Sequence, residues 1–95
     1  MKFLVYVLLN NLNGLIIQWG VESGTQTPNR TVSFPLQQFS QRPAVSGSII
    51  NNDNAAWLSI NNVSKTGFIV TQFYRSGNTI YNNGTSPITW MAIGY

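Results

Sequence analysis

The stretches TGFIVTQFY (Thr66–Tyr74) and ITWMAIGY (Ile88–Tyr95) decide the fold class of this chain. Both are rich in β-branched and aromatic residues, a composition typical of β-strands. Because successive side chains of a strand point to opposite faces, both stretches are apolar on both faces. In the first, for example, Phe68 and Ile69 fall on opposite faces. A strand of this kind must be covered on both sides.

A two-layer fold of 95 residues has a single interior, so one apolar face of each stretch would remain outside. An exposed apolar patch of that size on a monomer favours aggregation. We therefore predict that another copy of the chain covers it; ordinary core packing with irregular faces is the alternative. The residues expected at the subunit interface are Phe68, Ile69, Phe73, Trp90, Met91, Ile93 and Tyr95.

Short apolar runs separated by Gly, Pro and Asn clusters continue along the whole chain. Such runs are typical of a β-sandwich or barrel, and apolar residues seldom recur at the spacing of a helix. We predict an all-β fold, an antiparallel β-sandwich of about 7–8 short strands. The expected strands are 3–9, 15–19, 31–36, 45–50, 56–60, 66–74, 79–81 and 88–94.

The composition restricts the partners and the ways of stabilising the fold. Charged residues make up 7% of the chain, against about 25% in an ordinary soluble domain. The net charge is +3, but the five basic residues are scattered, whereas duplex binding usually needs a clustered basic stripe. We therefore expect no nucleic-acid partner. The chain has no cysteine, so no disulfide can stabilise this small fold, and oligomerisation is the remaining common device.

The residue types that carry most catalysis and metal binding are missing. Histidine and cysteine are absent, and Glu22 and Asp53 are the only carboxylates. Both carboxylates lie in predicted loops, where solvated turn residues are the ordinary explanation. No phosphate-loop, dinucleotide or calcium-loop pattern occurs. The sequence thus predicts a binding module that is not an enzyme and that holds neither cofactor nor metal.

The apolar run Phe3–Leu9 needs its own interpretation. It is far shorter than the roughly 20 residues that span a bilayer, so we expect no membrane insertion. Its Val and aromatic content favours a first β-strand. A signal peptide is the alternative, and residues 1–13 would then be the leader of a small secreted lectin or inhibitor.

Four segments, in this order and spacing, resemble the C-terminal domain of bacteriophage and prophage tail fibres. The segment 14–20, GLIIQWG, is similar to the opening of that domain. Segment 31–35, TVSFP, resembles its second strand, and segment 63–68, VSKTGF, resembles its central strand. Segment 90–95, WMAIGY, is similar to its closing strand. The resemblance covers residues 14–95 and leaves 1–13 as a segment outside the family.

The resemblance implies a trimeric β-sandwich that forms the receptor-binding tip of a tail fibre. Its partner would be a saccharide or protein on the bacterial cell surface, and it implies no catalysis and no cofactor. The chain would lie on the virion tail fibre, or in the bacterial cytoplasm if a prophage expresses it. The alternatives are a structural module for trimerisation or capping, and a truncated prophage remnant, neither of which binds a receptor.

Strand parity predicts where a ligand would bind. If strand 15–19 leaves the fibre shaft and the strands run up and down, the loops 20–29, 51–54 and 75–87 gather at the distal end. Amides, an aromatic ring and a few charges in these loops suit the hydroxyls and the apolar face of a sugar. The alternative for each of these residues is ordinary turn chemistry. The candidate receptor-binding residues are Arg75, Asn78, Tyr81, Asn82, Asn83, Asp53 and Glu22.

Overall fold

The computed structural model describes residues 3–9, 14–22, 29–36, 39–50 and 55–95. The described residues form eight strands and no helix, which confirms the all-β prediction. The strands are β1 (Phe3–Leu9), β2 (Ile16–Glu22), β3 (Asn29–Ser33), β4 (Ala44–Ile49), β5 (Ala55–Asn61), β6 (Gly67–Ser76), β7 (Thr79–Tyr81) and β8 (Ile88–Gly94).

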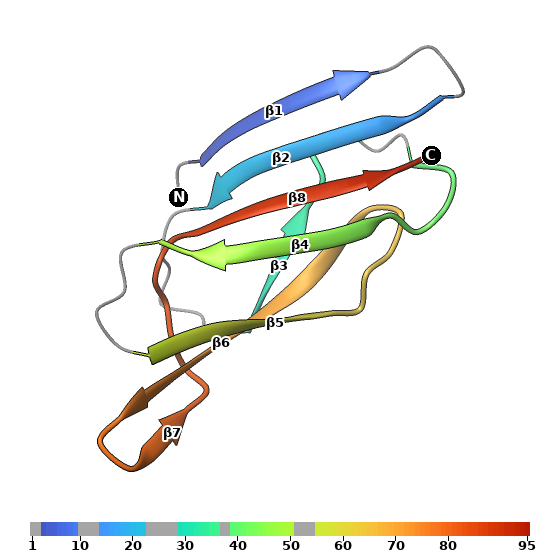
Figure 1. Cartoon of the computed structure of the whole chain (residues 1–95). Coiled ribbons are helices and arrows are strands. Elements are labelled where there is room, and N and C mark those ends of the chain that lie inside the picture. Colours follow the sequence, from blue (N-terminus) through green and yellow to red (C-terminus); the bar gives the residue numbers. More distant parts are fainter. Residues whose placement is uncertain (1–2, 10–13, 23–28, 37–38, 51–54) are drawn as a thin grey trace.

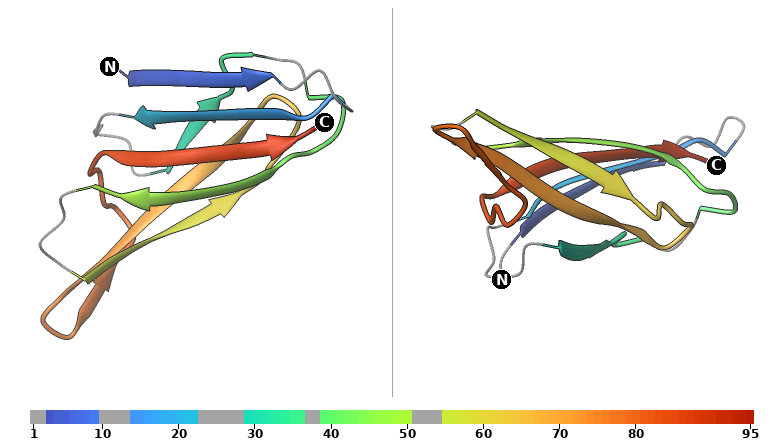
Figure 2. Two further views of the ribbon diagram at one scale, coloured as in Figure 1. Left: turned by 45° about the horizontal axis from the view of Figure 1, so that its top comes forward. Right: turned by 90° about the horizontal axis from the view of Figure 1, so that it is seen from below.

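The strands form two antiparallel sheets that pack as a sandwich (Figure 1). Sheet A has the order β1-β2-β8-β4. Sheet B has the order β3-β6-β5, and β7 pairs with the far end of β6. The two further views in Figure 2 show the two layers crossing at an angle. The predicted antiparallel sandwich is therefore confirmed.

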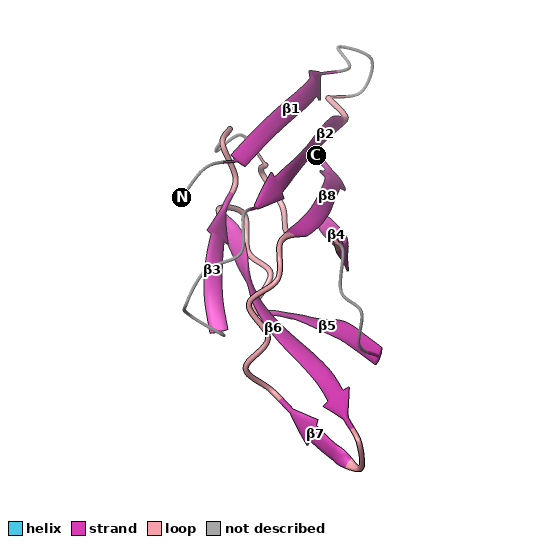
Figure 3. Cartoon of the chain, turned by 90° about the vertical axis from the view of Figure 1, so that its left-hand side faces the viewer, coloured by secondary structure: helices cyan, strands magenta, loops and turns pink. Residues whose placement is uncertain are grey.

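The strand registers define two ends of the sandwich. At one end Glu22 pairs with Ile88, and Ile49 pairs with the same residue. There β6 continues beyond the sandwich and returns as β7. We call this projecting hairpin, residues 74–81, the tongue (Figures 1 and 3). The carboxyl terminus lies at the opposite end (Figure 1). The strands that lead into the predicted loops 20–29, 51–54 and 75–87 all end at this tongue end of the sandwich.

The simple up-and-down order assumed for that prediction differs from the structure, because β8 lies between β2 and β4. β2 does run toward the tongue end, and β1, which precedes it, runs in the opposite direction. Because Phe3 pairs with Glu22, β1 begins at the tongue end.

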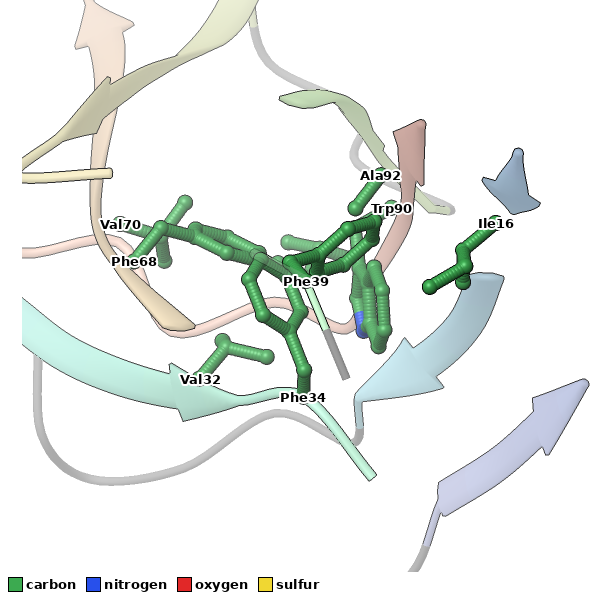
Figure 4. Close-up of a cluster of buried hydrophobic side chains, with 9 residues drawn as sticks. Ile16, Val32, Phe34, Phe39, Phe68, Val70, Trp90 and Ala92 are labelled. Atoms are coloured by element: carbon green, nitrogen blue, oxygen red, sulfur yellow. The ribbon is translucent and has the colours of Figure 1, made fainter. Parts of the chain in front are cut away.

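The core lies between the inner faces of the two sheets (Figure 4). The Phe34 ring is at its centre and contacts three other aromatic rings, with centroid distances of 5.2 to 5.9 Å. The core residues are Ile16, Val32, Phe34, Phe39, Phe68, Val70, Ile88, Trp90 and Ala92.

Two predicted interface residues, Phe68 and Trp90, belong to this core. Their exposed fractions are 1% and 4%, so they have almost no surface to offer a second copy. The prediction listed both faces of each two-sided strand, and these residues lie on the inner faces. Trp90 pairs with Gly20 on one side and Gly47 on the other. A Cβ on Gly47 would lie 2.8 Å from the Thr89 carbonyl oxygen, so this position requires glycine.

The carboxyl-terminal ends of three strands differ from those expected by two residues or more. β2 continues past residue 19 to Glu22, because residues 20–22 pair with β8. β3 ends at Ser33 rather than at residue 36, because Pro35 has no N–H to extend the ladder. β6 continues to Ser76, where it pairs with β7.

Two fully buried glutamines bind loop backbone inside the sandwich. Gln18 Nε2 donates to the Leu36 carbonyl at 2.8 Å, and the Leu36 N–H donates to Gln18 Oε1 at 3.0 Å. Gln72 makes the same pair of bonds with Ser86, at 2.6 and 3.0 Å. Each side-chain amide thus bonds both the N–H and the carbonyl of one loop residue, as a neighbouring strand would, and so satisfies these backbone groups. The Gln72 bonds fix the segment that leads from the tongue into β8.

Candidate functional site

The tongue presents different side chains on its two faces. Tyr74 pairs with Tyr81, and their rings stack with centroids 5.0 Å apart and an angle of 16° between their planes. The next pair, Arg75 and Ile80, lies on the opposite face because side chains alternate along a strand. The turn contains Gly77 at φ +61°, a conformation that glycine adopts without strain.

Five of the predicted receptor-binding residues lie on the tongue or directly after it. Arg75, Asn78, Tyr81, Asn82 and Asn83 are all exposed. Arg75 Nε donates to the Gly77 carbonyl at 2.9 Å, which fixes the base of the guanidinium. Arg75 and Tyr81 lie on opposite faces of the hairpin, so the structure brings them into one element but not onto one surface. Asp53 lies outside the described residues.

Glu22 is unsuited to contact a receptor because it is buried. Its exposed fraction is 5%, and its carboxylate accepts a hydrogen bond from Arg30 Nε in a salt bridge. Arg30 is equally buried, and its Nη2 donates to the Ser86 carbonyl at 3.1 Å. The pair therefore ties β2, β3 and the segment before β8 together at the base of the tongue. Sequence reasoning placed Glu22 in a solvated loop because nothing local indicates its partner.

The outer face of sheet A is apolar and exposed on the single chain. Met91, Ile93 and Tyr95 have exposed fractions of 46%, 39% and 53%. These three predicted interface residues lie on the face that the two-sided pattern left outside. A shallow groove of about 550 Å³ crosses the face, and its lining includes Ile17, Trp19, Val21, Ser46, Ser48 and Met91.

The outer face of sheet B carries a second aromatic feature. Trp57 pairs with Phe73, and their rings stack with centroids 5.7 Å apart and planes within 8° of parallel. Trp57 is 43% exposed. Ile69, also predicted at the interface, is half-buried on the same face. Trp57 was not among the residues predicted to bind a receptor or a second copy, because only the register of β5 against β6 pairs it with Phe73.

The described residues contain no group of three or more carboxylate or other metal-ligating side chains. They also contain no helix long and apolar enough to cross a membrane.

Comparison with known proteins identifies the domain. Residues 11–95 match the model of a family of tail fibre proteins, the Gp53-like C-terminal domain. The chain belongs to this family. The tail-fibre domain therefore has a phage-related, tail-associated role, as the motifs in segments 14–20 and 90–95 indicated. No curated protein matches it.

Two solved tail fibres share the fold of this tail-fibre domain. The N-truncated R1-type pyocin tail fiber matches with a TM-score of 0.65 and 23% identity, over 100% of this chain and 87% of that one. The N-truncated R2-type pyocin tail fiber matches with a TM-score of 0.65 and 16% identity, over 96% of this chain. This chain spans 37% of the R2-type chain.

Proposed function

We propose that this tail-fibre domain is a trimeric receptor-binding tip. It binds a saccharide or protein on the bacterial surface during host adsorption, and it acts as a binding module rather than as an enzyme. The family of tail fibre proteins supports the setting, and the pyocin fibres support the fold.

The projecting tongue is the observation that carries receptor binding. It extends beyond the sandwich, where no described strand of sheet A covers it (Figure 3). Exposed aromatic, amide and guanidinium groups lie on it within a few residues: Tyr81, Asn78 and Arg75. The buried Glu22–Arg30 pair and the Gln72–Ser86 bonds hold its base to both sheets. A hairpin with a rigid base presents these groups with little loss of conformational entropy on binding.

The outer face of sheet A supports the trimer. Its exposed Met91, Ile93 and Tyr95, with the groove beside them, form an apolar surface. No described residue of β2, β4 or β8 on this outer face is charged, since the carboxylate of Glu22 is buried. Depletion of charge and enrichment in aromatic residues and Met characterise the buried centre of subunit interfaces.

Adsorption to bacteria tests receptor binding. Fluorescently labelled protein is added to a panel of bacterial strains, and bound protein is measured by flow cytometry. We expect saturable binding to a subset of strains, and weaker binding of Arg75→Gln. A control variant, Lys65→Gln, lies in the turn before β6 at the opposite end and should bind normally. A stable trimer that binds no strain would favour a structural capping module instead.

Light scattering after size-exclusion chromatography tests the trimer. The wild-type protein should have three times the mass of one chain, 10.6 kDa. Met91→Asp places a charge on the apolar face of sheet A and should produce monomers. Ser33→Asp makes the same change at an exposed position of sheet B and should leave the mass unchanged. Monomeric wild-type protein, or dissociation by the second variant alone, contradicts the assigned interface.

A further inference from the structure

The outer face of sheet B is organised in cross-strand rows. Directly opposed residues of an antiparallel pair share a face, and the next row on that face is two residues along the strand. The aromatic row is Phe73 with Trp57. On one side of it lies a polar row of Asn29, Thr71 and Ser59. On the other side lies the row of Ile80, Arg75 and Ala55.

We propose that these three rows form a binding site for one pyranose ring that carries an acidic group, either a carboxylate or a phosphate. The inference rests on the proposed function, because it names the receptor chemistry and a surface of the same domain. The site differs from the face predicted from the sequence: it excludes Tyr81 and includes Trp57 and Phe73.

The aromatic row suits the apolar face of a sugar. Trp57 is 43% exposed, and its ring is nearly parallel to that of Phe73. Two parallel rings held by neighbouring strands form a rigid platform, since each restricts the rotation of the other. An aromatic ring packs against the C–H face of a pyranose and leaves the sugar hydroxyls at the edge. The rows on either side are where those hydroxyls would find partners.

The polar row supplies hydroxyl and amide groups in a fixed arrangement. Thr71 Oγ1 donates to Asn29 Oδ1, which links β6 to β3. Ser59 Oγ accepts a hydrogen bond from Asn61 Nδ2 at 3.1 Å. These bonds orient the groups before any ligand arrives, so little side-chain entropy is lost on binding.

Arg75 supplies the charge. Its Nε–H is bound to the Gly77 carbonyl, and both Nη groups of its fork are available within the described residues. A guanidinium fork matches the geometry of a carboxylate or phosphate. Arg75 lies two positions along β6 from Phe73, a distance of about 7 Å. The acidic substituent of a ring seated on the aromatic row falls within reach of a side chain as long as arginine.

Charge complementarity selects an acidic sugar over a neutral one. No acidic residue lies on the outer face of sheet B within the described chain. Glu22 is buried against Arg30 and compensates that arginine rather than Arg75. The net charge of +3 attracts an anionic surface at long range.

The experiment uses polysaccharide purified from a strain that binds the trimer. One portion has its carboxyl groups reduced, one is dephosphorylated with hydrofluoric acid, and one is untreated. Affinity is measured by biolayer interferometry for the wild type, Arg75→Gln, Trp57→Leu and Trp57→Phe. Lys65→Gln removes the same charge at the opposite end of sheet B and serves as the matched control.

We expect one of the two treatments to weaken wild-type binding about tenfold or more, as loss of a charge-assisted hydrogen bond does. Arg75→Gln should bind untreated polysaccharide as weakly as the wild type binds the treated form, and the treatment should not weaken this variant further. Trp57→Leu should lose binding to every form, while Trp57→Phe should retain most of it. Carboxyl reduction identifies a uronic-type acid as the group bound, and dephosphorylation identifies a phosphate.

Equal wild-type binding to all three polysaccharides, or full binding by Arg75→Gln, overturns the inference. Binding to cells but not to their polysaccharide also overturns it, because the receptor is then a protein; the proposed function survives that result. If the trimer binds no strain at all, the proposed function fails, which is a separate outcome.

Discussion

Replacing Arg30 by Met should destabilise the domain more than any other single loss of charge in the described chain. Arg30 and Glu22 are both about 5% exposed, so the substitution leaves a buried carboxylate without its cation. It also removes the hydrogen bond from Nη2 to the Ser86 carbonyl. Methionine has a similar length and keeps much of the apolar packing of the arginine stem.

The expected magnitude follows from the burial. Removing one partner of a buried pair costs about 3–5 kcal/mol, because the other charge remains desolvated. For a domain of this size, 1 kcal/mol shifts the melting temperature by roughly 4–8 °C, so we expect a fall of at least about 12 °C. Glu22→Gln retains a side-chain oxygen that can accept from Arg30 Nε, so it should cost less, about 1.5–3 kcal/mol. The double variant Glu22→Leu with Arg30→Met removes both charges and should recover most of the stability.

Thermal and urea denaturation, followed by circular dichroism at one protein concentration, measure these differences. Concentration is held constant because subunit association changes the apparent stability. A cost below about 1 kcal/mol for Arg30→Met would refute the reasoning, because it would mean that the pair is effectively solvated. A double variant no more stable than Arg30→Met would show that packing, rather than the unpaired charge, causes the loss.

Two further predictions concern the interior and use the same denaturation assays. Gln72→Leu should destabilise by about 1–3 kcal/mol, because the Ser86 N–H and carbonyl lose their partner; unchanged stability would mean that water replaces the amide. Gly47→Ala should cost about 1–3 kcal/mol, because the added Cβ lies 2.8 Å from the Thr89 carbonyl oxygen. A neutral Gly47→Ala would show that β4 moves away from β8 without loss.

Local composition predicted the bounds of three strands. β1, β7 and β8 have the expected bounds. The predicted strand ended at residue 19, whereas β2 ends at Glu22. Glycine and charged residues such as Gly20 and Glu22 are common in turns, so the sequence around them indicated a loop. Gly20 is in the strand because it pairs with Trp90, and Glu22 is there because Arg30 neutralises it. Both reasons depend on distant residues.

The candidate site was predicted in part. The exposed residues of the tongue, such as Arg75 and Tyr81, were named because turn composition is visible in the sequence. Trp57 and Phe73 were not assigned to the ligand site, because nothing local indicates that they stack. Their stacking depends on which residue of β5 pairs with which residue of β6, and a shift of one residue would move every side chain to the other face.

The sequence by itself determined the strand content and the two-sided character of β6 and β8, because both follow from alternation within a few residues. It also determined the tail-fibre family, through short motifs whose order and spacing are read along the chain. The tertiary structure alone decided which apolar face is core and which is exposed, and which acid is buried. It decided the aromatic and polar rows of sheet B as well. These depend on sheet order and register, which join residues far apart in the chain.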